Sequence, residues 1–425
     1  MFLEENPGCT ISKTTFDKLK PKALKLMKHA KWLQCICGVC DNISMVCRAI
    51  RLSMYRSNME VPTQLNSELE LAKHAVCDFG NYECLDRKCD GCSVSKLSGL
   101  LAEWVSDNPS ELIRYHRWKT VTETVGGKAV SKLRKVESTG QRWMLYNELD
   151  KDLQTFPLHL FNAISQLSAF KKCKQSLKSN QVVVIADFAE NYKCRQWSEE
   201  QACYYVRNSA TLHPLVLVSS EGSEVKRDSV VILSDDLSHD HAAVKSFIQV
   251  LSQHISMTYP HISELIIWSD GCSAQYKSRL PMMNLSQCFG THYNITWNFF
   301  GSRHGKGESD GESAVCKSYL DTSVKSEQQT IHDAHSAFKF LQKSDRNKPD
   351  GPSRRHFYFV KSADIQTIRQ LSPLTKDVLA IPRIRDIHHA VGGGNSISYA
   401  RSSCYCPSDE CQHRNQSYRV FKYPG

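Results

Sequence analysis

Hydrophobic and polar positions divide this chain of 425 residues into a helical part and a part rich in strands. Between residues 101 and 180, apolar side chains recur every three or four positions, a spacing that predicts mainly helix. The clearest series is Leu158, Phe161, Ile164, Leu167 and Phe170. From residue 181 the pattern changes to short β-branched runs, and the first of them, 182–185, predicts a central strand buried on both faces.

The segments after this strand predict a mixed sheet with helices packed against it. Residues 215–219 and 229–233 have strand character and are expected to pair with the first strand as hairpin partners. Asp240 is expected to cap a helix that Pro260 ends. A strand at 265–268, a helix at 275–289, a strand at 295–300 and a helix at 311–328 follow. This element order is that of the RNase H-like fold, an α/β fold in which helices cover both faces of a mixed sheet.

Three acidic residues occupy the places where such a sheet gathers carboxylates. Asp187 and Asp270 follow two of the predicted strands, and Asp310 lies at the start of the last helix. Phosphoryl transfer on a nucleic acid is served by two divalent ions about 3.5–4 Å apart, and hard cations of this kind prefer carboxylate oxygens. The alternative for each residue is an ordinary role in a turn or a helix cap.

The third acid has alternatives nearby. Glu308 and Glu312 flank Asp310, and any of the three is a candidate to face the metals. Gly311 favours Asp310, because glycine allows close approach of backbone or DNA. Glu190, shortly after Asp187, is either an auxiliary ligand or a partner of Lys193.

Three motifs carry a resemblance to a known family. Residues 186–192 read ADFAENY, residues 269–277 read SDGCSAQYK, and residues 304–311 read HGKGESDG. They resemble a transposase-related family scattered through animal genomes, over roughly residues 180–320. The resemblance implies an RNase H-like domain with a DDE/DDD acidic triad that uses Mg²⁺ or Mn²⁺ to cleave or transfer DNA strands. The 39 residues between Asp270 and Asp310 are similar to the spacing in mariner-like transposases.

Two other functions stay open. One is a domesticated or degenerate relative of a transposase that binds DNA or protein without catalysis. The other is a nuclease acting on RNA–DNA hybrids or branched DNA, because this fold hosts several reactions. The intact triad favours the transposase-like strand chemistry.

Basic residues near the acids are candidate DNA contacts. Lys277 and Arg279 follow the second acid, while His304 and Lys306 precede the third. Cations at these places suit the phosphate backbone of DNA. Ordinary loop polarity is the alternative for each of them.

Cysteines cluster at both ends of the chain, and zinc is the cofactor that we expect there. The pairs Cys37, Cys40 and Cys89, Cys92 have the Cys-x2-Cys spacing that places two thiolates on one tetrahedral ion. Cys77 and Cys84 are candidates to complete a site with the second pair. The first pair would then share an ion with Cys35 and with either His29 or Cys47. Because 48 residues separate the pairs, the sequence does not decide which cysteines share a metal.

The C-terminal cluster offers a third set of ligands. It consists of Cys404, Cys406, Cys411 and His413. These four either bind one ion or form two half-sites completed elsewhere. The scattered cysteines are expected to be small buried apolar residues; they are Cys173, Cys194, Cys203, Cys272, Cys288 and Cys316.

Spacing and composition together suggest four regions: a basic, Cys-rich module at 1–100, a mainly helical connector at 101–180, the catalytic domain at 181–345 and a C-terminal unit at 346–425. A flexible joint is expected at Gly392 to Gly394. Lys and Arg outnumber Asp and Glu by 54 to 44, with a run of lysines at 13–31, which favours DNA as the partner. The sequence leaves the oligomeric state open, with a homo-oligomer as one possibility.

No apolar run reaches the roughly 18 residues that a membrane span needs, and the first residues lack the basic start and apolar core of a secretory signal. We therefore expect no membrane association and a reducing compartment. The DNA hypothesis makes this compartment the nucleus.

Overall fold

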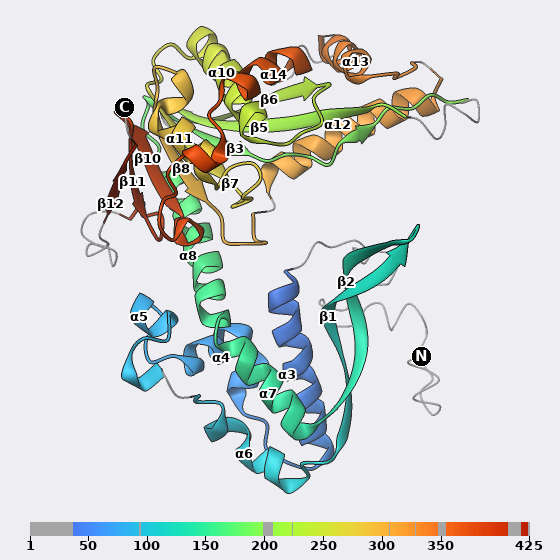
Figure 1. Ribbon diagram of the computed structural model, residues 1–425, viewed down its shortest axis with the longest axis vertical. Coiled ribbons are helices and arrows are strands. Elements are labelled where there is room, and N and C mark those ends of the chain that lie inside the picture. The colour runs from blue at the N-terminus through green and yellow to red at the C-terminus, as the bar shows by residue number, and fades with distance from the viewer. Residues whose placement is uncertain are drawn as a thin grey trace.

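The computed structural model describes residues 37–92, 95–198, 207–222, 224–305, 307–327, 329–346, 354–406 and 418–423. Several candidate residues lie outside these ranges: His29, Cys35, Cys203, Lys306, Cys411 and His413. Within the described ranges, the chain forms an N-terminal lobe, residues 37–153, and a C-terminal lobe, residues 181–423. A long helix, α8 (Phe156–Gln175), passes between them (Figure 1).

Helices build most of the N-terminal lobe. They are α3 (Gly38–Arg56), η2 (Thr63–Asn66), α4 (Glu68–Ala75), α5 (Tyr82–Leu85), η3 (Asp90–Cys92), α6 (Ser98–Asp107) and α7 (Arg142–Leu153). The apolar faces of α3, η2, α4, α6 and α7 meet in one core that contains Ile50, Leu101 and Trp104, while Cys84 of α5 and Cys92 of η3 belong to a separate small cluster. Arg142 is buried beside this core, where its guanidinium pairs with Asp107 and Glu111, as a buried charge requires.

A long hairpin interrupts the stretch for which the spacing predicts mainly helix. Strands β1 (Leu112–Val125) and β2 (Lys128–Gln141) pair in an antiparallel register along their whole length. Gly126 and Gly127 form the turn with positive φ angles, which glycine adopts without strain. The inner half of the hairpin packs beside α3 as far as Trp118, which bonds to Asp41 and Asn42, and the tip extends away from the lobe (Figure 1). Residues 101–180 are therefore only partly helical.

Helix α8 buries a different face from the one that its apolar spacing suggests. Ala163, Gln166 and Cys173 are buried, whereas Ile164 and Leu167 are exposed. Gln166 has no exposed surface, and its side-chain amide bonds to the backbone oxygens of Phe299 and His388 and to Ser403. Phe170 of the predicted series is also buried, against Trp268 and Phe300. The helix is therefore anchored to the C-terminal lobe by this ring, by small residues and by the polar contacts of Gln166.

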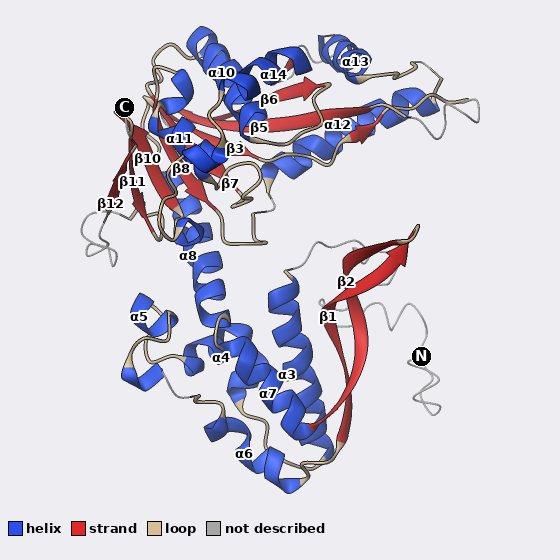
Figure 2. Cartoon of the chain, in the orientation of Figure 1, coloured by secondary structure: helices blue, strands red, loops and turns tan. Residues whose placement is uncertain are grey.

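A ten-stranded mixed sheet forms the centre of the C-terminal lobe (Figure 2). Its strands are β3 (Gln181–Ala186), β4 (Tyr192–Lys193), β5 (Ser209–Glu221), β6 (Glu224–Ser234), β7 (Glu264–Ser269), β8 (Asn294–Phe299), β9 (Arg355–Val360), β10 (His389–Gly393), β11 (Ser396–Ala400) and β12 (Arg419–Lys422). The order is β12-β11-β10-β8-β7-β3-β5-β6-β9, and β4 pairs with β5. Strand β3 pairs antiparallel with β5 and parallel with β7, and β7 is parallel to β8.

Helices cover both faces of the sheet. They are α10 (His241–Thr258), α11 (Arg279–Ser286), α12 (Glu308–Lys325), α13 (Ala334–Arg346) and α14 (Ser362–Leu371), with short 3₁₀ turns η4 (Cys288–Gly290), η5 (Thr375–Asp377) and η6 (Ile384–Asp386). Helices α10, α11 and α14 share one core with the sheet. Helices α12 and α13 pack on the other face, and α8 covers another part of it.

The predicted elements of this lobe are confirmed in order, with changed ends. The carboxylate of Asp240 accepts from two backbone N–H groups at the start of α10, as expected of a cap. Helix α11 is shorter than the predicted 275–289, and α12 begins three residues before the predicted 311. The expected flexible joint at Gly392 to Gly394 is wrong. Those glycines end β10 and enter the tight turn to β11, where Gly394 and Asn395 have positive φ.

None of the helices in the described part of the chain combines the length and apolar character that crossing a membrane requires.

Candidate metal centres at the strand ends and between the lobes

Asp187 and Asp270 lie level with each other on neighbouring parallel strands. The register pairs Ile185 of β3 with Trp268 of β7, and two more residues along each strand lead to the two acids. Neighbouring strands are about 4.8 Å apart, so the backbones of the two acids leave the same edge of the sheet side by side, just beyond the strand ends. Both residues are partly buried.

The start of α12 lies at the same edge. Ser309 Oγ donates to the backbone oxygen of Ile185 at 3.0 Å, which fixes the helix beside the end of β3. A Cβ placed on Gly305, in the preceding loop, would lie 3.3 Å from Asp270 Cβ. Asp310 accepts from the N–H of Gly307 at 3.0 Å and so forms the first turn of the helix. We call Asp187, Asp270 and Asp310 the acidic edge.

The two glutamates beside Asp310 are held by cations. Glu308 pairs with Lys174 of α8 at 2.9 Å and with Arg227 at 3.3 Å. Glu312 pairs with Arg355 at 2.6 Å. Because these partners already neutralise the glutamates, Asp310 is the member of the trio best suited to a metal. Glu190 is exposed.

Buried side chains shape the loop that carries Asp187. Phe188 stacks on His239 with ring centroids 4.4 Å apart and meets the edge of the buried His213 ring. Asn191 accepts from Thr211 and contacts His239 at 2.8 Å. The ADFAENY motif therefore contains residues that hold the loop as well as the candidate ligand.

Asp270 begins a tight turn. Its Oδ1 accepts from the N–H of Cys272 at 3.1 Å, and burial raises the pKa of its carboxyl group. Tyr276 is buried in the same loop and its hydroxyl contacts His213 at 3.0 Å. Burial, followed by the negative charges of Asp187 and Asp270, raises the pKa of Tyr276 well above its usual value. The charges of both acids therefore influence the same buried hydroxyl group, that of Tyr276.

Two of the expected DNA contacts near the acids, Lys277 and Arg279, are engaged within the C-terminal lobe, and Lys306 lies outside the described residues. Lys277 is buried, donates to the backbone oxygen of Arg385 at 2.9 Å and lies over the Phe299 ring; burial lowers its pKa to about 8. Arg279 donates to the backbone oxygens of Thr375 and Val378. Both cations join loops of the C-terminal lobe. His304 has a different role.

His304 belongs to a cluster of two cysteines and two histidines between the lobes. Cys37 and Cys40 lie at the start of α3, His159 lies in the first turn of α8, and His304 precedes α12. The four ligand atoms all lie within 4.8 Å of one another. We call these residues the interlobe cluster. Of the partners expected for Cys37 and Cys40, Cys47 is instead buried in the apolar core of the N-terminal lobe, while Cys35 and His29 lie outside the described residues.

The imidazoles of this cluster are in the form that binds metals. Burial, followed by the charges of His304 and Arg303, lowers the pKa of His159 to about 4. Burial also lowers the pKa of His304. Both rings are therefore neutral at physiological pH, with a lone pair for a metal. Burial and the neighbouring Cys37 raise the pKa of Cys40 to about 12.

A second group of thiols lies in the N-terminal lobe. The sulfur atoms of Cys77, Cys89 and Cys92 lie within 4.8 Å of one another, and Cys84 Sγ is 3.5 Å from Cys89 Sγ. A Cβ at position 91 would lie 2.7 Å from Cys77 Sγ, so Gly91 leaves room for that sulfur. Cys77, Cys89 and Cys92 could hold a metal ion, and Cys84, the fourth cysteine that the sequence suggests, contacts Cys89. We call these four cysteines the four-cysteine knuckle.

The C-terminal cluster is described only in part. Cys404 and Cys406 are partly buried, and Lys172 Nζ lies 3.4 Å from Cys406 Sγ. Cys411 and His413 lie outside the described residues. Of the cysteines expected to be buried, Cys173, Cys194 and Cys316 are, whereas Cys272 and Cys288 are partly exposed.

Within the described ranges, the groups of three or more metal-binding side chains that converge within 4.8 Å contain only cysteine and histidine. The acidic edge is not among them, so its three carboxylates are more widely spaced. A pair of ions about 3.5–4 Å apart also needs ligands spread over more than one coordination sphere.

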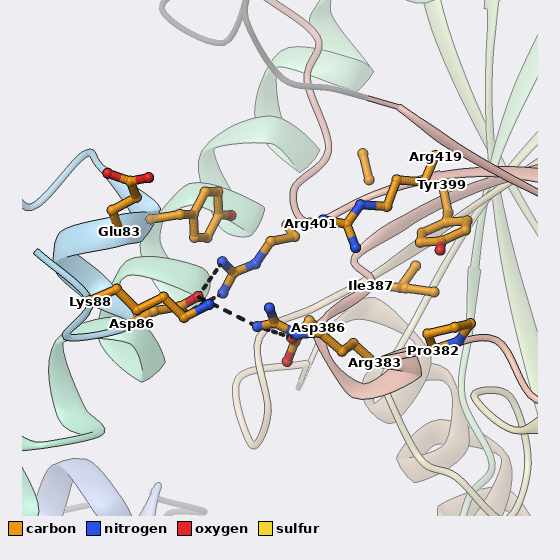
Figure 3. Close-up of a pocket in the computed structure, with 12 residues that line it drawn as sticks. Glu83, Asp86, Lys88, Pro382, Arg383, Asp386, Ile387, Tyr399, Arg401 and Arg419 are labelled. Atoms are coloured by element: carbon orange, nitrogen blue, oxygen red, sulfur yellow. Dashed lines mark hydrogen bonds and ion pairs between the residues drawn. The ribbon is translucent and has the colours of Figure 1, made fainter.

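A cleft of about 500 Å³ lies between α5 with the residues that follow it, on one side, and β11 with the loop before β10, on the other (Figure 3). Arg401 donates two hydrogen bonds, of 3.0 and 2.8 Å, to the carboxylate of Asp86. The central carbon of its guanidinium lies 3.9 Å from the centre of the Tyr82 ring. Arg383 adds a third contact to Asp86 at 3.5 Å. No member of the acidic edge lines this cleft. The contacts of Arg401 and Arg383 with Asp86 hold the segment after α5 against the C-terminal lobe.

The cluster histidines could not be recognised from the sequence. His159 and Cys37 are 122 residues apart, and His304 and Cys40 are 264 apart, so no local spacing joins them. The sequence suggests a DNA contact for His304 itself, because it precedes the third acid.

Comparison with known proteins places the chain in one family. Residues 166–415 match the family described as Domain of unknown function (DUF8701). The match covers more than half of the chain and includes the acidic edge and His304, while Cys37, Cys40 and His159 precede it. No curated protein and no solved structure matches the chain. The chain belongs to the DUF8701 family.

Proposed function

We propose that this protein is a transposase-like nucleotidyltransferase that cleaves or transfers DNA strands with Mg²⁺ or Mn²⁺, on an RNase H-like domain. The observation that carries the proposal is the arrangement of the acidic edge. Asp187 and Asp270 end neighbouring parallel strands in the same register, and Ser309 holds the helix of Asp310 to β3. The strand order β6-β5-β3-β7-β8, with β5 alone antiparallel to its neighbours, supports the RNase H-like assignment.

The donor set fits hard divalent ions. All three members of the acidic edge are carboxylates, and Mg²⁺ and Mn²⁺ prefer oxygen ligands. Asp270 is partly desolvated, and its contact within the described residues is a backbone N–H. A nearby cation would stabilise its ionised form. The cysteine and histidine groups suit a softer ion.

Each member of the edge has a distinct task. Bound divalent ions activate a water or a 3′-hydroxyl and stabilise the leaving oxygen. Asp187 and Asp270 hold negative charge at the strand ends, where Phe188 and the Asp270 turn limit movement of their loops. Asp310 adds a third carboxylate from the start of α12, and Gly305 keeps the neighbouring loop close to Asp270.

Cleavage of supercoiled plasmid DNA tests the function. With the full chain, we expect Mn²⁺-dependent nicking that chelation abolishes and that Asp270→Asn reduces at least about 1,000-fold, because the variant loses a metal-binding charge. Asp228→Asn, on the β5–β6 hairpin, is the control and should retain cleavage. DNA binding without cleavage by the wild type would favour a domesticated binding protein.

We further propose that the β1–β2 hairpin is a DNA contact. Lys119 and Arg134 lie opposite each other in the register, Lys132 is two residues from Arg134 on the same face of the outer half, and all three are exposed. A two-stranded ribbon fits the major groove of DNA, and lysines suit its phosphates. This surface takes the place of Lys277, Arg279 and His304 in the proposal. DNA as the partner makes the nucleus the expected location.

Salt dependence of DNA binding tests the hairpin. The double variant Lys119→Ala, Lys132→Ala should bind duplex DNA more weakly, and the slope of log affinity against log salt should fall by about two, since two phosphate contacts are lost. The matched control is Lys361→Ala, Lys376→Ala, two exposed lysines of the C-terminal lobe. An unchanged slope in the hairpin variant would exclude this surface.

We also propose that the four-cysteine knuckle binds structural zinc. Four cysteine sulfurs are a common closed set for this ion. The amine of Lys96 lies 3.3 Å from Cys77 Sγ, and a nearby positive charge favours the thiolate form that zinc binds. The bound ion would give this small loop folding energy that its few apolar residues cannot supply.

A further inference from the structure

The interlobe cluster joins three segments that are far apart in the sequence. Cys37 and Cys40 come from the start of α3, His159 from α8 and His304 from the loop between β8 and α12. Its four ligand atoms come from side chains that are partly or fully buried. Burial raises the pKa of Cys40, and a bound metal ion would offset this because it deprotonates the thiols that coordinate it.

The distances within the cluster match a tetrahedral ion. Zinc–sulfur bonds of about 2.3 Å and zinc–nitrogen bonds of about 2.0–2.1 Å place sulfur about 3.6 Å from nitrogen and the two nitrogens about 3.3 Å apart. Cys37 Sγ is 3.3 Å and Cys40 Sγ is 3.6 Å from His159 Nε2. Cys40 Sγ is 3.6 Å from His304 Nε2, and the two histidine nitrogens are 3.2 Å apart. Two thiols and two neutral imidazoles are a complete ligand set for structural zinc.

The loop that carries His304 also reaches the acidic edge. Gly301 packs so closely on α8 that a Cβ there would lie 2.7 Å from Ala163 Cα. His304 N donates to Gly301 O at 2.9 Å, and Gly305 lies against Asp270. The loop then enters α12 at Glu308, two residues before Asp310. The position of His304 therefore bears on the position of the third acid.

We propose that Cys37, Cys40, His159 and His304 bind one zinc ion that fastens α3 and α8 to the loop before Asp310. All four positions are filled by the protein, so the ion is structural, and catalytic zinc sites instead keep a position open. The zinc couples the N-terminal lobe to the acidic edge, and His304 is a positioning residue. The effect on cleavage rests on the proposed function, whereas zinc binding does not.

Zinc content per chain tests the clamp. The full chain is purified without chelators, and its zinc is measured by mass spectrometry. We expect His304→Ala and Cys40→Ser each to hold one zinc fewer than wild type. His332→Ala, which removes an exposed histidine, should hold the wild-type number. Cys89→Ser should lose the other ion, that of the four-cysteine knuckle. Folded His304→Ala protein with the wild-type zinc content would overturn the clamp.

Cobalt substitution keeps the test valid if variants do not fold. Wild-type chain loaded with Co²⁺ should show the visible absorption of tetrahedral cobalt with thiolate ligands. Cys89→Ser should show less of this absorption and keep the part that comes from the interlobe cluster. Loss of all such absorption in folded Cys89→Ser would contradict a second thiolate site.

Cleavage measured on the same samples separates the two proposals. His304→Ala should lose zinc and cleavage together, while His304→Cys, which keeps a zinc ligand, should restore both in part. Lost zinc in a protein whose wild type never cleaves DNA would leave the clamp standing and overturn the proposed function. A His304→Ala protein that keeps its zinc but loses cleavage would overturn the clamp and leave the proposed function standing.

Discussion

Asp310→Asn should reduce metal-dependent DNA cleavage at least about 1,000-fold, equivalent to about 4 kcal/mol of activation free energy. Asp310 is the acid at the start of α12 that is not paired with a cation among the described ion pairs, and it lies one residue after the serine that fixes the helix to β3. The variant keeps the shape of the side chain and one oxygen that accepts from Gly307. Its loss of charge is therefore the main change at the edge.

Glu312→Gln provides the matched control on the same helix. Its carboxylate pairs with Arg355, so we expect its cleavage rate to stay within about tenfold of wild type. Single-turnover cleavage under saturating Mn²⁺ measures both rates. If Glu312→Gln instead lost as much cleavage as is expected for Asp310→Asn, and Asp310→Asn stayed active, Glu312 would be the third acid.

Gln166→Leu should lower the free energy of unfolding by about 3 kcal/mol. The amide of Gln166 is buried and joins α8 to β8 through the backbone oxygen of Phe299, to the residue before β10 through that of His388, and to the segment after β11 through Ser403. Each buried polar group left without a partner costs about 1–3 kcal/mol. Leucine removes all of these bonds while keeping a similar volume.

Urea unfolding monitored by tryptophan fluorescence measures this loss. Gln175→Leu, at the exposed end of the same helix, should change the stability little. A Gln166→Leu protein as stable as wild type would show that water or repacking satisfies these groups.

The sheet of the C-terminal lobe could be predicted because its signals are local. Runs such as 182–185 are long enough to cross a buried sheet, and Asp240 and Pro260 mark the ends of α10. The acids follow these strands directly, so their common edge follows from the parallel pairing of β3 and β7. The choice among Glu308, Asp310 and Glu312 needed the positions of Lys174 and Arg355, which come from distant segments.

Other features could not be predicted because they depend on tertiary contacts. The apolar residues Ile164 and Leu167 suggested the buried face of α8, yet Gln166 lies inside because its amide satisfies backbone groups of two other segments. Much of the hairpin is exposed on both faces, so no alternation of apolar and polar residues marked its outer half. The interlobe cluster gathers residues with no shared spacing.

The most direct test of the central claim is to locate manganese in crystals of the protein soaked in Mn²⁺, using anomalous scattering. We predict manganese between the carboxylates of Asp187 and Asp270, near Asp310, and zinc at the interlobe cluster and the four-cysteine knuckle. Zinc at those clusters with no manganese at the ends of β3 and β7 would contradict a metal-dependent site at the acidic edge.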